Sequence, residues 1–125
     1  MACVLIVEDD PLLRELLCTV LEEAGYETLE AADGETGIEL FRVRQPEMVL
    51  LDILLPLQDG IETLRALRKE YPRVKIVAMS GGGQGVTKEN ALAAAAALGA
   101  AQTLAKPFSR EQLLGIVTAV LAPEE

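Results

Sequence analysis

Short apolar runs alternate along this chain with segments of helical periodicity, and this alternation limits the folds that the chain can adopt. Residues 4–7, 48–51 and 76–79 are uninterrupted runs of aliphatic or sulfur-containing side chains. Runs of this length are typical of strands that are buried on both faces, as in a parallel sheet. Residues 13–21, between two such runs, place leucines and a valine at helical spacing. The pattern therefore predicts an α/β fold with helices on both faces of a doubly wound parallel sheet.

Weaker signals complete the predicted order of elements. Residues 26–31 alternate polar and apolar side chains as an edge strand does, and residues 103–105 form a short final strand. Pro11 is expected to begin the first helix, and Gly25 to end it. Further helices are expected after Asp33-Gly34, after Asp59-Gly60, over residues 87–98, and after a capping box at Ser109-Arg110-Glu111-Gln112. The sequence thus predicts five strand–helix units in a single domain over residues 1–125.

The composition excludes several classes of function. The chain has 11 basic and 20 acidic residues and a net charge of −9, so nucleic acid and anionic membranes are not expected as direct partners. It contains no histidine, which excludes His-ligated zinc, His-activated nucleophiles and phosphohistidine within this chain. Cys3 and Cys18 are expected to be reduced thiols in the core. No apolar stretch approaches the roughly 18 residues of a membrane span, and a cytoplasmic protein is predicted.

Polar residues follow four of the predicted strands. Glu8-Asp9-Asp10 follow the first strand, Asp52 the third, Ser80 the fourth and Lys106 the fifth. Because ligands of open parallel sheets bind beyond the carboxyl ends of the strands, these side chains are expected to meet at one edge of the sheet. Taken singly, the acidic triplet could cap the next helix, Asp52 and Ser80 could be turn residues, and Lys106 could be a solvated charge. Their joint occurrence at successive strand ends favours a functional site.

A group of carboxylates with no histidine or thiolate beside it favours Mg²⁺, which prefers oxygen ligands in octahedral geometry and keeps some of its waters. A carboxylate beside such an ion can attack a phosphoryl group, because the ion and a lysine neutralise the charge on the transferring oxygens. A hydroxyl and backbone amides would then bind the phosphoryl group after transfer. These residues therefore point to Mg²⁺-dependent phosphoryl transfer to a carboxylate.

Over essentially its whole length the chain resembles the receiver domain of response regulators, found in two-component signalling and in single-domain chemotaxis regulators. The resemblance rests on Val7-Glu8-Asp9-Asp10, on Asp52-Ile53-Leu54-Leu55-Pro56 followed by Asp59-Gly60, on Ser80, and on Lys106-Pro107-Phe108. It implies a flavodoxin-like sheet with strand order 2-1-3-4-5 and five helices. It also implies a phosphorylation-controlled switch that acts on a downstream protein. The phosphoryl group would come from a sensor histidine kinase or a histidine phosphotransfer protein, and the domain's own chemistry would be limited to phosphoryl uptake and slow hydrolysis.

The resemblance also assigns roles to individual residues. Asp52 is the expected phosphoacceptor. Mg²⁺ would be held by acidic side chains and one backbone carbonyl, namely Glu8 (through water), Asp9, Asp52 and Leu54. The phosphoryl oxygens would be bound by an ammonium group, a hydroxyl and a backbone amide, namely Lys106, Ser80 and Gly81. The bond between Lys106 and Pro107 is expected to be cis.

Three features depart from the usual receiver pattern. Thr103 stands three positions before the lysine, where an aromatic residue is usual, so the inward rotation of a ring is unavailable. Leu55 replaces a frequent methionine, which is a small change in shape. Gly81-Gly82-Gly83-Gln84-Gly85 lengthens the connection between the fourth and fifth strands. Ser80 and Thr103 are the predicted switch positions, and phosphorylation is expected to order residues 81–98 instead of rotating an aromatic ring.

Two other functions share most of these features, and two further functions are excluded by the sequence. The chain could be a receiver fragment of a larger DNA-binding transcriptional regulator, or a non-phosphorylated pseudo-receiver that only binds partners. The complete set of Asp9, Asp52, Ser80 and Lys106 argues against the pseudo-receiver. A P-loop is excluded because Val86-Thr87-Lys88 breaks its pattern. A haloacid-dehalogenase-type phosphatase would need a second aspartate where Leu54 stands.

Overall fold

A five-stranded parallel sheet forms the centre of the computed structural model, which describes residues 2–53, 59–80 and 88–122. The strands are β1 (Cys3–Val7), β2 (Glu27–Ala31), β3 (Met48–Asp52), β4 (Ile76–Ser80) and β5 (Gln102–Ala105). They lie in the order β2-β1-β3-β4-β5, and each neighbouring pair is parallel. The flavodoxin-like order that the resemblance implies is therefore confirmed.

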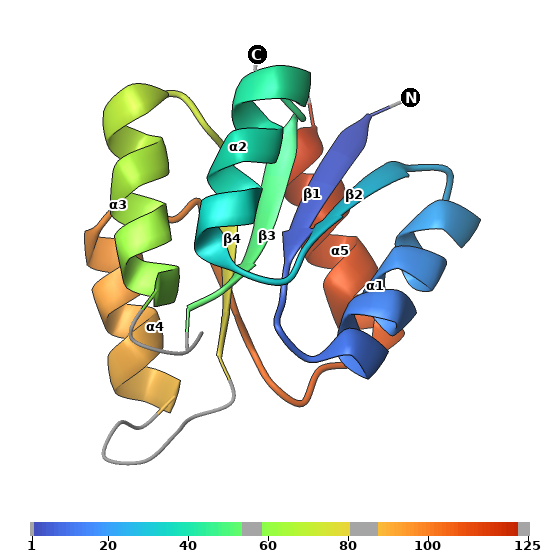
Figure 1. The fold of residues 1–125 in the computed structure, drawn as a ribbon. Coiled ribbons are helices and arrows are strands. Elements are labelled where there is room, and N and C mark those ends of the chain that lie inside the picture. Colours follow the sequence, from blue (N-terminus) through green and yellow to red (C-terminus); the bar gives the residue numbers. More distant parts are fainter. Residues whose placement is uncertain (1, 54–58, 81–87, 123–125) are drawn as a thin grey trace.

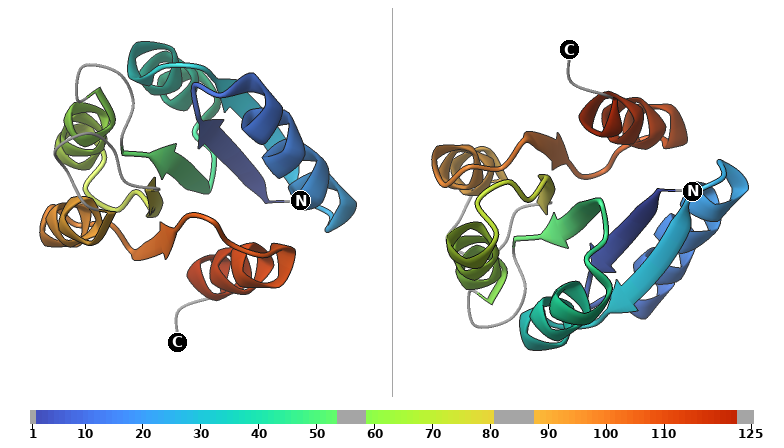
Figure 2. Two further views of the ribbon diagram at one scale, coloured as in Figure 1. Left: turned by 90° about the horizontal axis from the view of Figure 1, so that it is seen from below. Right: turned by 90° about the horizontal axis from the view of Figure 1, so that it is seen from above.

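Helices cover both faces of this sheet (Figures 1 and 2). One face packs against α1 (Pro11–Glu23) and α5 (Arg110–Leu121), and the other packs against α2 (Gly34–Arg44), α3 (Asp59–Glu70) and α4 (Lys88–Ala97). The central strands β3 and β4 are buried along their whole length, whereas the edge strands β2 and β5 are partly exposed. This difference explains why the central strands read as continuous apolar runs and the edge strands do not.

The ends of the helices follow the predicted start and stop signals. Asp10 caps α1, which begins at Pro11, and Gly25 follows the helix with a left-handed φ of +98°. Ser109 and Gln112 form the predicted capping box of α5. Among the described helices, none combines the length and the apolarity that a membrane span requires.

The two cysteines differ in burial. Cys18 is buried in α1, and burial raises the pKa of its thiol to about 11. The prediction that both thiols lie in the core is wrong for Cys3, which is only partly buried. Cys3 is the first residue of β1 and borders a surface hollow that Glu22 and Arg44 also line, so the sheet is not fully covered there.

Candidate functional site

The carboxyl ends of the strands bring the polar residues of the predicted site to one edge of the sheet. Asp52 is the last residue of β3 and Ser80 the last of β4, and both are buried. Glu8 follows β1, and its backbone amide donates a hydrogen bond to the carbonyl of Ala31 at the end of β2 (3.0 Å). Lys106 follows β5, and its backbone amide donates to the carbonyl of Ser80 (2.8 Å). The ladder of parallel strands therefore fixes the spacing of these side chains.

Three carboxylates gather at this edge. One oxygen atom from each of Glu8, Asp9 and Asp52 lies within 4.8 Å of the others. Glu8 and Asp52 are buried, whereas Asp9 is exposed to solvent. Asp10 has a different role, because its carboxylate caps α1 by accepting a hydrogen bond from the amide of Leu12 (3.0 Å). The acidic triplet thus divides into two members of the cluster and one helix cap.

Lys106 reaches into the acidic cluster. Its Nζ donates to Glu8 Oε1 (2.8 Å) and to Asp52 Oδ2 (3.0 Å). Burial alone would lower the pKa of this ammonium group, but the hydrogen bond to Glu8 and the charge of Asp52 outweigh burial, so the pKa of Lys106 lies above its ordinary value. Lys106 is therefore charged at neutral pH and bridges the two buried carboxylates.

Glu8 is the carboxylate most affected by its surroundings. Burial raises its pKa to about 7, and the charge of Asp52 contributes to the rise, although hydrogen bonds from Lys106 and from the Asp10 amide favour the ionised form. The site therefore concentrates negative charge where little water can reach it. Such a site attracts positive charge.

The donor set suits a hard divalent cation. It consists of carboxylate oxygens from Glu8, Asp9 and Asp52, with neither histidine nor thiolate among them. The exposed Asp9 leaves one side open to solvent, and Mg²⁺ usually keeps several of its waters when it binds a protein. These three side chains could therefore hold Mg²⁺.

The remaining predicted positions have varied outcomes. The Lys106–Pro107 peptide bond is cis, as expected from the resemblance. Thr103 is half-buried in β5 and borders a shallow hollow next to Gly115 of α5. The Leu54 carbonyl and the Gly81 amide lie outside the described residues, so their predicted contacts stay predictions.

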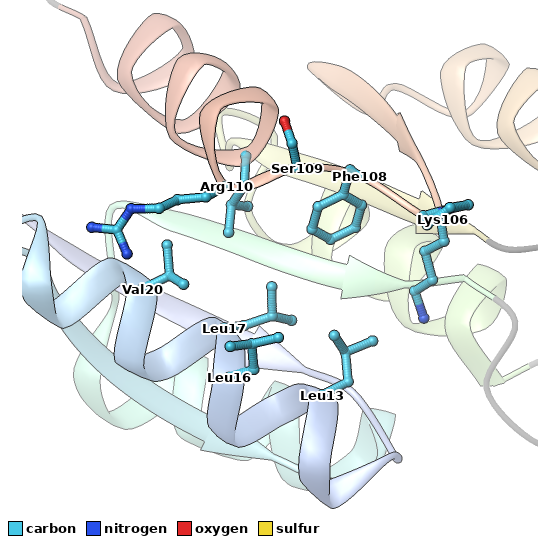
Figure 3. A pocket seen from close by; sticks show the side chains of 10 residues that line it. Leu13, Leu16, Leu17, Val20, Lys106, Phe108, Ser109 and Arg110 are labelled. Atoms are coloured by element: carbon cyan, nitrogen blue, oxygen red, sulfur yellow. The ribbon is translucent and has the colours of Figure 1, made fainter.

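A groove beside the site was not predicted from the sequence (Figure 3). It has a volume of about 350 Å³ and lies between α1 and the segment that leads into α5. Leu13 and Leu16 line its α1 side, and Phe108 lines the other side. Lys106 also lines the groove, and its ammonium group contacts Asp52. The groove and the acidic site therefore have Lys106 in common.

A signal for this groove was present in α1. Leucines stand at positions 13, 16 and 17, and Leu16 stays 57% exposed in the structure, so this helix carries more apolar residues than its contact with the sheet buries. Arg14 was also missed: its Nη1 donates to the backbone carbonyl of Glu8 (2.9 Å). A single arginine on an amphipathic helix cannot be told from a solvated charge by spacing alone.

Comparison with known proteins agrees with this geometry. Residues 4–118 match the model of the "Response regulator receiver domain" family. Protein CcdB of Bacillus subtilis (strain 168) is 32% identical over 97% of this chain and 98% of its own length. The phosphate regulon transcriptional regulatory protein PhoB of Pseudomonas aeruginosa is 35% identical over 94% of this chain and 51% of its own length. The crystal structure of a response regulator from Chloroflexus aurantiacus J-10-fl is 32% identical, has a TM-score of 0.87, and is covered over 98% of both chains.

The curated relatives differ in length. The chain spans about half of several of them, for example 47% of the probable transcriptional regulator ycf27 of Porphyridium aerugineum, which is 32% identical to it. The family model nevertheless extends over most of this chain, and the observed strand order is the one that the family implies. The chain belongs to the response regulator receiver domain family of two-component systems.

Proposed function

We propose that this receiver domain is a phosphorylation-controlled switch in which Asp52 accepts the phosphoryl group. The observation that carries the proposal is the environment of Asp52. This buried strand-end carboxylate contacts Lys106 Nζ at 3.0 Å and belongs to the acidic cluster with Glu8 and Asp9. Phosphoryl transfer depends mainly on positioning and on neutralisation of charge, and this arrangement supplies both.

The transfer step forms one bond and breaks another. A carboxylate oxygen of Asp52 bonds to phosphorus while the bond from phosphorus to the donor atom breaks, and the donor keeps that electron pair. Lys106 would pair with an oxygen of the phosphoryl group, since its Nζ already lies beside Asp52. Water later breaks the phosphorus–oxygen bond, which releases inorganic phosphate and restores the carboxylate of Asp52.

Ser80 would bind the phosphoryl group after transfer. It ends the strand next to that of Asp52, and it is buried at the same edge of the sheet. Its hydroxyl can donate a hydrogen bond to a second phosphoryl oxygen. The Gly81 amide, which lies outside the described residues, is proposed to donate to the third.

Mg²⁺ is the proposed cofactor, because the donors of the acidic cluster are all carboxylate oxygens. Asp9 and Asp52 would bind the ion directly, Glu8 through water, and the Leu54 carbonyl would be a further ligand. When bound, the ion would neutralise charge on the transferring oxygens. Lys106 supplies a second positive charge beside Asp52, so the lysine and the ion would share this task.

The phosphoryl donor is proposed to be a histidine kinase or a histidine phosphotransfer protein. These 125 residues contain no histidine, so a phosphohistidine must lie outside them. The groove between α1 and the segment before α5 supports docking of such a donor, because Lys106 belongs both to the groove wall and to the site. A helix that laid apolar side chains against Leu13, Leu16 and Phe108 would bring a reactive group close to Asp52.

A second candidate function is that of a receiver within a longer DNA-binding regulator. The observation that favours it is the length of relatives such as PhoB, a transcriptional regulatory protein of which this chain spans 51%. Phosphorylation of Asp52 would then control an output domain in the same polypeptide. In both cases the chemistry at Asp52 is the same.

Labelling with acetyl phosphate tests the proposed chemistry. The intact mass of the wild type should increase by one phosphoryl group in the presence of Mg²⁺, and the increase should be absent when EDTA removes the ion. Asp52→Asn should not be labelled, because an amide is not a nucleophile for this step. Undiminished labelling of Asp52→Asn would show that Asp52 is not the phosphoacceptor. Labelling of the wild type that does not depend on Mg²⁺ would show that the proposed metal site is wrong.

A further inference from the structure

Arg14 of α1 lies directly behind the turn that carries the acidic cluster. Its Nη1 donates to the backbone carbonyl of Glu8 (2.9 Å), and its Nε pairs with Glu30 Oε1 of β2 (3.3 Å). Only 20% of the Arg14 side chain is exposed. One guanidinium group therefore connects three elements: the turn after β1, the helix α1 and the edge strand β2.

The contact with Glu8 acts on the peptide group that joins Glu8 to Asp9. The carbonyl that Arg14 binds belongs to this peptide group, so its direction fixes the backbone from which the Asp9 side chain projects. The amide of Glu8 is held by Ala31 (3.0 Å), and the amide of Asp10 donates to Glu8 Oε2 (3.1 Å). Between these two amides, Arg14 supplies the contact that holds the Glu8 carbonyl.

We infer that Arg14 is a positioning residue for the cation site, holding the Glu8–Asp9 peptide group so that both carboxylates point into one cluster. The inference rests on the proposed function, in which Glu8 and Asp9 help to hold Mg²⁺. Groups that orient metal ligands without touching the ion typically change metal affinity by about 10- to 100-fold when removed. Mg²⁺ is sensitive to ligand placement, because it requires nearly ideal octahedral geometry.

Charge and position make opposite predictions for loss of Arg14. Its positive charge lies near the acidic cluster, so electrostatics alone would let Mg²⁺ bind more tightly to Arg14→Ala. Loss of the hydrogen bond to Glu8 would instead leave this part-buried carbonyl without its donor and release the turn, which weakens binding. The sign of the change in affinity therefore separates the two roles.

The test is calorimetric titration of the EDTA-treated and dialysed protein with MgCl₂. Arg14→Ala should raise the dissociation constant about tenfold or more relative to the wild type. Arg42→Ala is the matched control, because it removes the same positive charge. Arg42 belongs to α2 and pairs with Glu70 of α3 (3.0 Å), and neither residue contacts Glu8 or Asp9. The dissociation constant of Arg42→Ala should equal that of the wild type.

Thermal unfolding of the metal-free proteins separates positioning from general stability. A merely structural arginine would lower the unfolding temperature and leave the Mg²⁺ dissociation constant of the folded protein unchanged. If Arg14→Ala does not fold, Arg14→Lys replaces it, since a single ammonium nitrogen cannot bind the Glu8 carbonyl and Glu30 as the guanidinium fork does. Weaker binding by that variant supports the inference.

Unchanged or tighter Mg²⁺ binding by the folded Arg14 variant would overturn the inference and leave the proposed function standing. A wild type that binds no Mg²⁺ would overturn both. The two failures are therefore distinguishable within one experiment.

Discussion

Lys106 is a cation in direct contact with two buried carboxylates. Its Nζ lies 2.8 Å from Glu8 and 3.0 Å from Asp52, and both acidic side chains are almost fully shielded from water. Buried charges of one sign are costly unless a partner neutralises them. Lys106 therefore has a structural role in addition to the proposed pairing with a phosphoryl oxygen.

The variant Lys106→Met keeps most of the side-chain stem and removes the charge. In EDTA the free energy of unfolding should fall by about 2 kcal/mol, because Glu8 and Asp52 lose a shared donor. Mg²⁺ should stabilise this variant more than the wild type, since the ion replaces the missing positive charge. Urea unfolding with and without Mg²⁺ measures both effects.

The exposed Lys69 of α3 provides the control for this measurement. Lys69→Met should change neither the stability in EDTA nor the response to Mg²⁺. An equal loss of stability in the two variants would contradict the structural role of Lys106.

At the scale of single residues, the sequence predicted which side chains lie close together but not which hydrogen bonds they form. The order of strand ends was sufficient to group Glu8, Asp9, Asp52 and Lys106, because parallel strands all end at one edge. The double contact of Lys106 and the contact of Arg14 with the Glu8 carbonyl depend on side-chain rotamers and on the seating of α1. Spacing along the chain carries no information about either.

Among the elements, α3 makes an unusually close approach to the strand that carries Asp52. A Cβ atom on Gly60 would meet the backbone of Ile53 and would lie 2.5 Å from the carbonyl oxygen of Asp52. Backbone atoms cannot move aside as the end of a side chain can. Gly60 is therefore required for the first turn of α3 to lie against the end of β3.

Gly60→Ala should destabilise the protein by more than about 2 kcal/mol, because the backbone next to Asp52 must shift. Labelling by acetyl phosphate should slow in the same variant. Gly115→Ala is the matched control. Gly115 is an exposed residue of α5, and no atom lies within 4 Å of the Cβ that alanine would add there. That substitution should stabilise the helix by about 0.5–1 kcal/mol.

Chemical denaturation of the two variants measures both changes. Equal stabilities for Gly60→Ala and Gly115→Ala would contradict the close approach of α3 to β3.

Helix ends were predictable where a local interaction defines them. Asp10 with Pro11, and Ser109 with Gln112, are self-contained caps, and the structure has them as expected. The proposed switch is different, because it depends on the response of residues 81–98 to a phosphoryl group. In the part of this segment whose side chains are described, Ala95 is buried and the alanines next to it are exposed, so residues 93–97 of α4 bury little side-chain area. The ordering of this segment stays a prediction.

On the scale of the whole molecule, the proposed phosphorylation site and the groove share one residue, Lys106. The site lies at the carboxyl edge of the sheet, and the groove extends from Lys106 along α1 towards the start of α5 (Figure 3). A small phosphodonor needs only the site, whereas a protein donor also needs a place to dock. The two kinds of donor can therefore be distinguished by changes in the groove.

Leu16→Arg places a charge on the apolar wall of the groove. The rate of transfer from a phosphorylated histidine kinase, divided by the rate from acetyl phosphate, should fall by about tenfold or more. Val43→Arg is the matched control, because Val43 is also an exposed apolar residue (77%) but belongs to α2 on the other face of the sheet. Its rate ratio should match that of the wild type.

These ratios are measured by following radiolabelled phosphate from donor to acceptor. An equal fall for Leu16→Arg and Val43→Arg, or no fall for either, would contradict docking in this groove.

The overall architecture followed from the sequence more completely than its surfaces did. Continuous apolar runs distinguish buried central strands from edge strands, and helical segments between them require parallel pairing. The groove was missed because it is formed by two elements that are distant in the chain, α1 and the start of α5. The partial exposure of Cys3 was missed because it also depends on elements distant in the chain. The apolar run of a strand does not show how far along the strand the neighbouring helices extend.

The central claim is that Asp52 carries the phosphoryl group, and chemical mapping of the modified residue tests it most directly. Borohydride reduces the acyl phosphate of an aspartate to homoserine, which peptide mass spectrometry can locate in the sequence. After incubation with acetyl phosphate and Mg²⁺, we predict homoserine at position 52, and none in a sample kept in EDTA. Homoserine at Asp9 or at another acidic residue, with position 52 unmodified, would contradict the account.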